Sequence, residues 1–253
     1  MYAPDFSLKG KIALVTGASR GIGEAIATAF ALQGAQCILT GRKIVGLNEV
    51  VAKINSIGGR AEAIACHAGD LDQIRHLVRE VQERFGRIDI LVNNAATNPY
   101  SGPTMLDATE AAWDKTFDVN VKGVFFLTQL VVPLMTKGGS IINTASIDGV
   151  RPGVGRGIYS MTKAAVISMT KAFAKELADR NIRVNAILPG LVDTSMSRVL
   201  MEDPAIYEKV IHDVPMHRHA KPEELSGAAL YLASAASSYT TGAILTVDGG
   251  ALA

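Results

Sequence analysis

The stretch Ile12-Ala-Leu-Val-Thr-Gly-Ala-Ser-Arg-Gly-Ile-Gly23 decides the fold of this chain. Its first five residues form a short apolar run that predicts a strand, and a helical pattern follows from Glu24 to Leu32. Glycine allows the backbone to turn tightly and to approach a phosphate closely, and a helix start offers free N–H groups to an anion. Three glycines in an isolated turn are weak evidence. Their place between a first strand and a first helix favours a phosphate-binding loop, formed by Gly17, Gly21 and Gly23.

The same alternation of short apolar runs and longer helical patterns continues along the chain. Strands are predicted at residues 12–16, 37–40, 61–66, 88–92, 140–145, 182–188 and 243–247. Helices are predicted at 24–32, 47–57, 70–85, 109–117, 121–135 and 158–180, with a further helix opened by Pro222. Continuously apolar strands separated by helices indicate a parallel sheet covered on both faces. We therefore predict one α/β domain over residues 1–253, a Rossmann-type doubly wound parallel sheet of about seven strands.

Composition allows one large core and excludes several classes of partner. Of the 253 residues 48% are hydrophobic, and 25 basic residues almost balance 24 acidic ones. A net charge of +1 gives no electrostatic reason to expect nucleic acid or an anionic membrane. The first ten residues lack the pattern of a signal peptide, and the apolar stretch 124–135 is too short to span a bilayer. Cys37 and Cys66 lie in apolar runs, so we expect buried, reduced thiols and a cytoplasmic protein.

Tyr159 and Lys163 are four residues apart in the predicted helix 158–180, and they therefore share one face. An ammonium beside a phenol favours the phenolate, so we expect Lys163 to lower the pKa of Tyr159 from about 10. Ser146, just after the predicted strand 140–145, could hydrogen-bond the same substrate oxygen. The three side chains suit proton transfer to or from an alcohol or carbonyl oxygen. Taken alone, the Tyr–Lys spacing would more often describe a surface pair.

Basic side chains take the place where a nucleotide-binding fold often has an acid. That acid lies about 20 residues beyond the glycine loop and binds a ribose 2′-hydroxyl. No Asp or Glu occurs between Ala25 and Asn48, and the predicted second strand instead ends in Thr40-Gly-Arg-Lys43. Together with Arg20 in the loop, Arg42 favours a 2′-phosphate and hence NADP(H) over NAD(H). Ordinary solvated loop charges are the alternative.

From Lys11 to Gly250 the chain resembles the classical short-chain dehydrogenase/reductase family. The matching segments are the loop Thr16 to Gly23, Asn93-Asn94-Ala95, Asp118-Val-Asn120-Val, Ser146 with Tyr159 and Lys163, Asn185 with Pro189-Gly190 and Thr194, and Asp248-Gly-Gly250. The resemblance implies that Tyr159 is the general acid/base and that Ser146 orients the substrate oxygen. It implies further that Lys163 lowers the pKa of Tyr159 and holds the nicotinamide ribose, and that Asn120 holds a water linking Lys163 to solvent.

The resemblance also implies a cofactor site formed by Gly17, Ser19, Arg20, Gly21, Ile22, Gly23, Arg42, His67, Ala68, Asn94, Ala95, Tyr159, Lys163, Pro189, Gly190, Val192 and Thr194. Two positions depart from the family pattern. His67 stands where the family has an aspartate that contacts the adenine, so we expect stacking or a hydrogen bond from histidine instead. Ala96 replaces a glycine, and its methyl group would narrow the nicotinamide ribose site.

Four further features carry weaker expectations. Helices 121–135 and 158–180 are apolar on several sides, which favours packing against a second subunit in a dimer or homotetramer, with burial inside one chain as the alternative. Residues 191–216 form an insertion that suits a substrate loop or lid, although its apolar residues would equally pack a small helix. Asp148-Gly149 favours a turn, with contact to a polar or cationic substrate as the alternative. His217-x-His219 lacks partner ligands, so no metal is expected.

These features favour an NADP(H)-dependent oxidoreductase that interconverts a small secondary alcohol and a ketone, similar to 3-oxoacyl or other carbonyl reductases. One alternative is an NAD-dependent alcohol dehydrogenase of the same family. Another is a cofactor-binding module without catalysis, against which the presence of all four residues Asn120, Ser146, Tyr159 and Lys163 argues. The sequence does not distinguish ketones, 3-oxoacyl thioesters, sugars and steroids as substrates.

Overall fold

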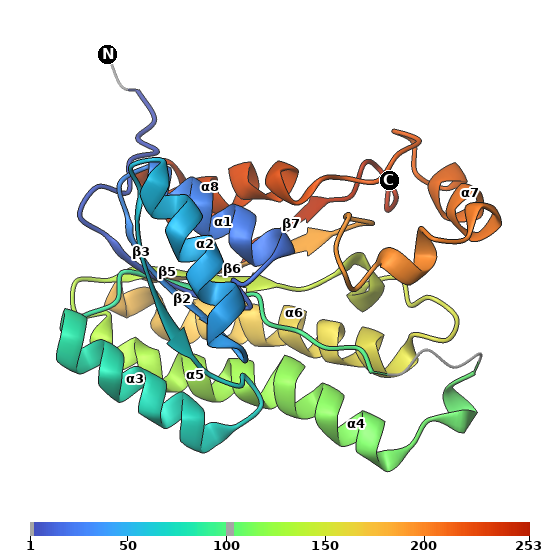
Figure 1. Cartoon of the computed structure of the whole chain (residues 1–253), viewed down its shortest axis with the longest axis horizontal. Helices are drawn as coiled ribbons and strands as arrows, with labels where there is room; N and C mark the ends of the chain where they lie inside the picture. Colours follow the sequence, from blue (N-terminus) through green and yellow to red (C-terminus); the bar gives the residue numbers. More distant parts are fainter. Residues whose placement is uncertain (1–2, 100–103) are drawn as a thin grey trace.

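A single parallel sheet organises the chain, whose computed structural model describes residues 3–99 and 104–253 (Figure 1). Its strand order is β3-β2-β1-β4-β5-β6-β7. The strands are β1 (Ile12–Thr16), β2 (Gln36–Gly41), β3 (Arg60–Ala65), β4 (Ile90–Asn93), β5 (Gly139–Thr144), β6 (Ile182–Pro189) and β7 (Ile244–Val247). The predicted Rossmann-type sheet is thereby confirmed. The order reverses between β1 and β4, where the loops leave in opposite directions and open a crevice at the carboxyl ends of the strands.

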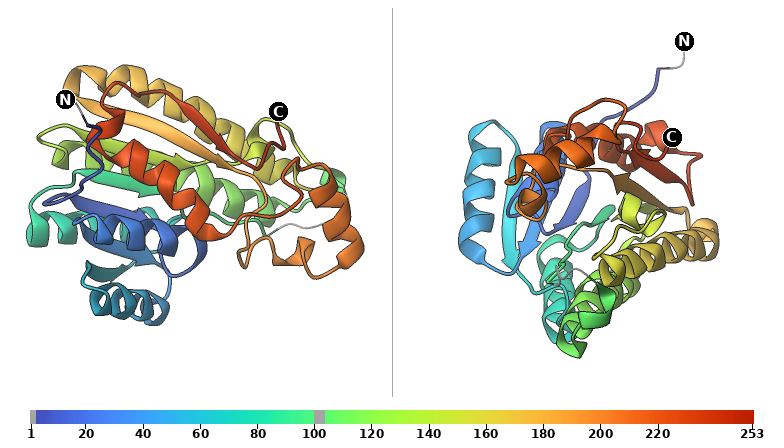
Figure 2. Two further views of the ribbon diagram at one scale, coloured as in Figure 1. Left: turned by 90° about the horizontal axis from the view of Figure 1, so that it is seen from above. Right: turned by 90° about the vertical axis from the view of Figure 1, so that its right-hand side faces the viewer.

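Helices cover both faces of the sheet (Figure 2). One face carries α1 (Gly21–Leu32), α2 (Ile44–Ser56) and α8 (Ser226–Ala233), and the other carries α3 (Leu71–Phe85), α5 (Gly123–Val131) and α6 (Gly157–Leu177). Successive side chains of a strand point to opposite faces. Val15 of β1 accordingly packs in the cluster that contains Phe30 of α1, and Leu14 packs in the cluster that contains Leu77 of α3. Strands buried on both sides explain why the sequence shows continuous apolar runs.

Helix α3 begins and ends where its residues predict. The Asp70 carboxylate accepts hydrogen bonds from the backbone N–H groups of Asp72 and Gln73, which satisfies two of the free donors at the helix start. Gly86 ends the helix with φ 74°, in the left-handed region that glycine adopts without a Cβ penalty.

The two helices predicted at 109–117 and 121–135 are in fact one continuous helix. It runs from Glu110 to Leu134 through α4 (Glu110–Phe117), a π-helical turn at Asp118–Lys122, α5 and a 3-10 turn at Val132–Leu134. The π turn changes the angle at which the apolar stripe continues around the helix. In the amino-acid sequence this interruption of the helical period looks like the end of one helix and the start of another. By length and composition alone the helix could cross a membrane. Buried core helices meet the same criterion, and half of its most apolar window is buried in this protein.

Residues 191–216 form a small helical unit. It contains a 3-10 turn at Arg198–Leu200 and α7 (Pro204–His212), which starts at Asp203 and extends beyond the carboxyl ends of β6 and β7 (Figure 1). The Tyr207 hydroxyl lies 2.7 Å from Nδ1 of His219, which ties α7 to the segment that leads to α8. The position at the mouth of the crevice is compatible with both expectations for this insertion, a lid and a packed helix.

Candidate active site

The glycine loop is held in place by the neighbouring end of β4. The Thr16 hydroxyl accepts the backbone N–H groups of Asn94 and Ala95 at 2.9 and 3.0 Å, and the Asn94 amide donates to the carbonyl oxygens of Thr16 and Gly17. These bonds join the carboxyl ends of β1 and β4, the two strands that border the crevice. The loop therefore has one defined conformation.

The same loop forms a cradle that suits the diphosphate of a dinucleotide. Gly17 and Gly21 adopt φ values of 65° and 61°, which side chains with a Cβ rarely adopt. A Cβ on Gly17 would lie 2.9 Å from the Ala95 backbone, and one on Gly23 would collide with the Gly17 carbonyl oxygen. No side chain caps the start of α1, so its first N–H groups and the helix dipole face the loop. The donor set and the space both fit a bound phosphate.

A cavity of about 1010 Å³ extends from this loop to the insertion 191–216. Seventeen residues were predicted to hold the cofactor, and all but Gly23 line the cavity: Gly17, Ser19, Arg20, Gly21, Ile22, Arg42, His67, Ala68, Asn94, Ala95, Tyr159, Lys163, Pro189, Gly190, Val192 and Thr194. Gly23 contributes from behind the loop, where it leaves room for the Gly17 carbonyl and the Asn94 amide. The predicted residues thus form one continuous site.

The two ends of the cavity differ in charge. Arg20 and Arg42 are exposed at the end next to β2, and neither forms an ion pair with a carboxylate of the described residues. Asp148 and Asp213 are the acids that line the cavity within residues 3–99 and 104–253, and both lie toward its other end. The guanidinium groups near β2 are therefore available to an anion.

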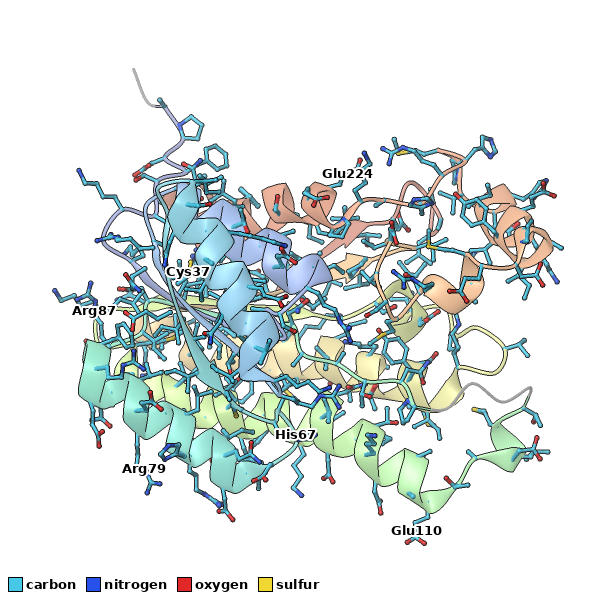
Figure 3. All side chains as sticks on the ribbon, in the orientation of Figure 1. Cys37, His67, Arg79, Arg87, Glu110 and Glu224 are labelled. Carbon is cyan, nitrogen blue, oxygen red and sulfur yellow. The ribbon has the colours of Figure 1, made fainter. Side chains whose placement is uncertain are left out.

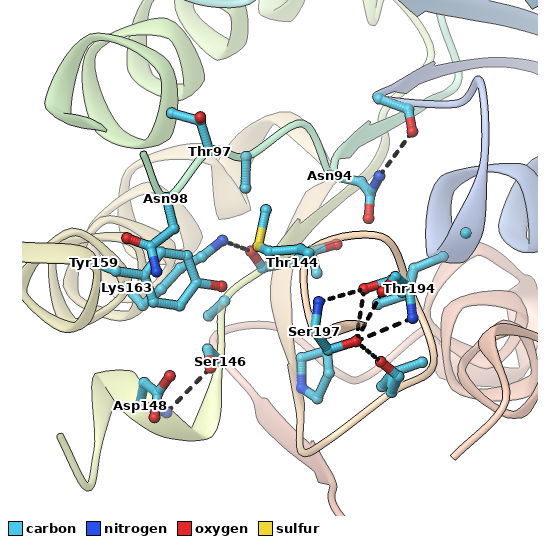
Figure 4. Close-up of a pocket in the computed structure, with 18 of the residues that line it drawn as sticks. Asn94, Thr97, Asn98, Thr144, Ser146, Asp148, Tyr159, Lys163, Thr194 and Ser197 are labelled. Atoms are coloured by element: carbon cyan, nitrogen blue, oxygen red, sulfur yellow. Dashed lines mark hydrogen bonds between the residues drawn. The ribbon is translucent and has the colours of Figure 1, made fainter. Parts of the chain in front are cut away.

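Ser146, Tyr159 and Lys163 meet in the wall of this cavity (Figure 4). Tyr159 and Lys163 project from the first turns of α6, and the Lys163 ammonium lies 5.4 Å from the centre of the Tyr159 ring. Ser146 follows the end of β5, and its hydroxyl is placed to hydrogen-bond the phenol. The Lys163 ammonium donates to the Thr144 carbonyl oxygen at 2.7 Å. The predicted shared face of the helix is confirmed.

The electrostatics of this trio differ from the expectation. Burial is the largest effect on Tyr159 and raises the pKa of its phenol above 10, and the nearby Asp148 carboxylate raises it further. The Ser146 hydroxyl and the Arg156 guanidinium act in the opposite direction but are weaker. The prediction that the pKa of Tyr159 is lowered is therefore wrong for the groups that the chain itself supplies. Burial also lowers the pKa of Lys163 to about 8, and Asp148 partly opposes this effect.

The chain matches known proteins over almost its whole length. The family model described as Enoyl-(Acyl carrier protein) reductase matches residues 17–251. The chain is 42% identical over 245 residues to the 3-oxoacyl-(acyl-carrier-protein) reductase FabG of Thermotoga maritima, covering 96% of this chain and 98% of that protein. The chain belongs to the short-chain dehydrogenase/reductase family. It is accordingly an oxidoreductase that acts on CH–OH and C=O groups.

Solved structures of this family agree with the assignment. A gluconate 5-dehydrogenase from Burkholderia cenocepacia, in complex with NADP and tartrate, is 32% identical with a TM-score of 0.94 and covers 98% of each chain. A 7α-hydroxysteroid dehydrogenase, complexed with NADH and 7-oxo glycochenodeoxycholic acid, is 34% identical with a TM-score of 0.93, covering 99% of this chain and 98% of that one. Members of the family with the same fold therefore differ in substrate and in cofactor.

Asn120 differs from the other predicted catalytic residues of the family because it does not line the cavity. It lies in the π turn, where its side chain bonds both backbone groups of Thr97 at 2.8 and 2.9 Å and the Thr162 hydroxyl at 3.1 Å. Asn120 thus fixes Thr97, which does line the cavity, to α6. Both amide protons are used by these bonds, and the predicted role of Asn120 in holding a water that links Lys163 to solvent stays a prediction.

The two departures from the family pattern are both in the cavity wall. His67 lies just beyond β3 (Figure 3), and its Nδ1 accepts the Gly69 N–H at 3.1 Å, which fixes the ring beside the cavity. Ala96 lies between Asn94 and Thr97 in the loop after β4. The contacts predicted for these residues with adenine and with the nicotinamide ribose stay predictions.

Sequence reasoning missed several residues of this wall. Thr97 and Asn98 come from the loop after β4, which shows no periodic pattern (Figure 4). Asp148 does form the predicted turn, Ile147–Gly149, but its buried carboxylate also faces the cavity and lies 3.0 Å from Nη1 of Arg156. Unlike Thr97 and Asn98, Asp148 was considered from the sequence, because it lies two residues after Ser146, but as the less favoured alternative to a turn.

The two cysteines and His219 behave as side chains of the scaffold, although Cys66 also lines the cavity. Cys37 and Cys66 are buried and unpaired, as predicted, and burial raises the pKa of their thiols to about 12 and about 11. His219 bonds Tyr207. No group of three or more potential metal-binding side chains occurs among the described residues.

Proposed function

We propose that this protein is an NADP(H)-dependent oxidoreductase that interconverts a small secondary alcohol and a ketone. The observation that carries the proposal is the convergence of Ser146, Tyr159 and Lys163 in one cavity with the phosphate cradle of the glycine loop. When bound, the nicotinamide dinucleotide supplies the donor or acceptor of the hydride. The protein residues position the substrate oxygen and control its proton.

Each member of the trio has a distinct proposed role. Tyr159 gives a proton to the carbonyl oxygen in reduction and accepts it from the alcohol in oxidation. Ser146 holds the same oxygen by hydrogen bonding. Lys163 carries the positive charge that stabilises the phenolate, and the Thr144 carbonyl oxygen fixes the direction of its ammonium. Asn120 is a positioning residue that acts through Thr97 and α6.

The preference for NADP(H) is supported by Arg20 and Arg42. Each offers a fork of N–H donors suited to a phosphate, and neither is neutralised by a carboxylate within the described residues. A carboxylate that would bind a 2′-hydroxyl and repel a 2′-phosphate is likewise absent from the part of the cavity wall next to β2, as far as the structure describes it. A dinucleotide that carries the additional phosphate would gain two charge-assisted contacts.

The proposed assembly is a homodimer or homotetramer formed through residues 121–135 and 158–180. Phe125 on α5 is 39% exposed and Met161 on α6 is 41% exposed, so each helix presents a large apolar side chain to solvent. The ring centre of Phe125 lies 5.4 Å from that of Phe173 on α6, with the two rings tilted by 36°. This contact joins the apolar side chains of the two helices into one surface. Such a surface favours a second copy of the chain. The two buried thiols favour a reducing compartment. The net charge of +1 gives no electrostatic reason to expect an anionic membrane, so a cytoplasmic location is proposed.

Tyr159→Phe tests the chemistry. Loss of the phenolic proton should reduce turnover by about 10²–10⁴-fold, because that is the usual contribution of a general acid/base. The affinity for NADPH should change little, since the ring is retained. Turnover is followed by the absorbance of reduced nicotinamide over a panel of ketones, 3-oxoacyl thioesters, sugars and steroids. Tyr239→Phe, at an exposed position, is the matched control. Near wild-type turnover by Tyr159→Phe would overturn the proposed mechanism.

Arg42→Asp tests the cofactor preference. The ratio of kcat/KM for NADPH to that for NADH should fall by about 10–100-fold, the usual worth of one charge-assisted hydrogen bond. Arg79→Asp makes the same charge change on the outer side of α3, away from the cavity, and should leave the ratio unchanged (Figure 3). A wild-type enzyme that prefers NADH would contradict the proposed role of both arginines.

A further inference from the structure

Asp148 is a buried carboxylate in the substrate end of the cavity that the proposed chemistry does not use. Its residue is 5% exposed, and its side chain lines the cavity beside Ser146 and Tyr159 (Figure 4). It lies in the short turn Ile147–Gly149, whose first residue follows Ser146 directly. The Asp148 N–H donates to the Ser146 hydroxyl oxygen at 3.1 Å, so the two side chains are held on one rigid turn.

The turn packs closely against α6. Gly149 rests directly on α6, and a Cβ there would come within 2.8 Å of the Lys163 carbonyl carbon. Asp148 therefore lies beside the first turns of α6, which carry Tyr159 and Lys163. A substrate whose oxygen meets Ser146 and Tyr159 brings its neighbouring atoms into the part of the cavity that this turn lines.

Arg156 neutralises the carboxylate only in part. Its Nη1 lies 3.0 Å from Oδ2 of Asp148, and its guanidinium lies flat against the backbone of Gly153. The side chain of Arg156 is 40% exposed, whereas that of Asp148 is 7% exposed, so the carboxylate is desolvated more than its partner. The charged or titratable groups that act on Asp148 are Arg156 and Lys163, with the Tyr159 phenol beside them.

A buried carboxylate needs more hydrogen bonds than this one partner gives. An ionised carboxylate has about four acceptor positions. Oδ2 of Asp148 pairs with Arg156, and neither carboxylate oxygen is among the buried atoms of the described residues that lack a hydrogen-bond partner. The remaining acceptor capacity therefore faces the cavity, where water can meet it in the free protein and a donor on a substrate can take the place of that water.

We propose that Asp148, held by Arg156, is a specificity-determining residue that binds a hydrogen-bond donor on the carbon next to the reacting one. The favoured substrates are alcohols and ketones with a neighbouring hydroxyl or ammonium group. The inference rests on the proposed function and adds a substrate class to it. An apolar neighbour such as a methyl group would leave the carboxylate buried and unsatisfied, which is the stronger source of discrimination.

Three alcohols of nearly equal shape test the inference: propylene glycol, isopropanolamine and sec-butanol, which differ in a hydroxyl, an ammonium or a methyl group beside the reacting carbon. Binding to the complex of enzyme and NADP is measured by calorimetry, and kcat/KM is measured for oxidation. We expect at least one donor-bearing alcohol to be favoured over sec-butanol by about 10–100-fold. Absence of this preference, or no binding of either donor-bearing alcohol, overturns the inference.

Substitution of Asp148 separates binding from a structural role. In Asp148→Ala the preference ratio should fall to about 1, because the acceptor is gone. Asp148→Asn keeps the shape of the side chain and an acceptor oxygen, so it should lose the preference for ammonium and keep part of the preference for hydroxyl. A role confined to holding the loop would lower kcat/KM for all three alcohols alike and leave the ratios unchanged. That result would overturn the inference, even if Asp148→Ala fails to fold, because the asparagine variant decides it.

Failure of the inference and failure of the proposed function give different results. Turnover of simple ketones that depends on Tyr159, with a flat ratio among the three alcohols, would keep the proposed function and reject the role of Asp148. Turnover that survives Tyr159→Phe would reject the function itself.

Discussion

Lys163→Met should change how the stability of the protein depends on pH. Burial lowers the pKa of Lys163 from 10.5 to about 8, and its residue is 3% exposed, so solvent screens this effect little. A protonated amine opposes folding when its pKa is lower in the folded state than in the unfolded one. The contribution of Lys163 to the free energy of unfolding is therefore least favourable below pH 8 and rises as the pH increases toward 10.5. Methionine has no proton to lose and removes this dependence.

The size of the effect follows from the two pKa values. For folded and unfolded values of about 8 and 10.5, the wild type should gain about 2 kcal/mol relative to Lys163→Met between about pH 7 and about pH 9.5. Urea unfolding at fixed protein concentration measures this difference at each pH. Lys171→Met, at an exposed position of the same helix, is the matched control for the loss of a lysine side chain. A difference for Lys163→Met that is equal at both pH values would refute the reasoning.

Two further substitutions test the scaffold of the site, and a third tests the proposed assembly. Gly23→Ala should cost about 1–3 kcal/mol and weaken NADPH binding, because its Cβ meets the Gly17 carbonyl oxygen and comes within 2.6 Å of the Asn94 amide; thermal unfolding and calorimetry measure the two effects. Asn120→Ala should lower kcat and destabilise the protein by about 1–3 kcal/mol, because the three hydrogen bonds of a buried side chain are lost; a variant with wild-type kcat would show that Thr97 does not need this support. Phe125→Asp should dissociate the proposed oligomer, which light scattering would detect, and an unchanged mass would place the interface elsewhere.

The fold and the cofactor end of the cavity could be predicted because their signals are local. The three glycines stand within residues 17–23, where Gly17 and Gly21 adopt φ values of 65° and 61°, although part of the crowding that excludes a Cβ comes from the distant Asn94 and Ala95. The strand runs are continuous because both faces of the sheet are covered. The shared face of Tyr159 and Lys163 follows from helix geometry alone.

The parts that could not be predicted depend on contacts between distant residues. The π turn around Asn120 is stabilised by Thr97 and Thr162, which lie 23 and 42 residues away in the chain. A single sequence read for a 3.6-residue period shows only a shift of phase at this point. The ion pair of Asp148 with Arg156 spans an irregular loop, so neither partner indicated the other.

The charge state of the trio shows why proximity alone did not predict its chemistry. The spacing of Tyr159 and Lys163 fixes their distance, but burial fixes the cost of any charge on either of them. Because burial raises the pKa of Tyr159 and lowers that of Lys163, both side chains are driven toward their neutral forms. Asp148 raises the pKa of both residues, so it helps Lys163 to keep its proton and Tyr159 to keep its own. In the proposed mechanism a protonated Tyr159 beside a charged Lys163 is the form that gives a proton to a carbonyl oxygen, and the raised pKa of Tyr159 favours its protonated form.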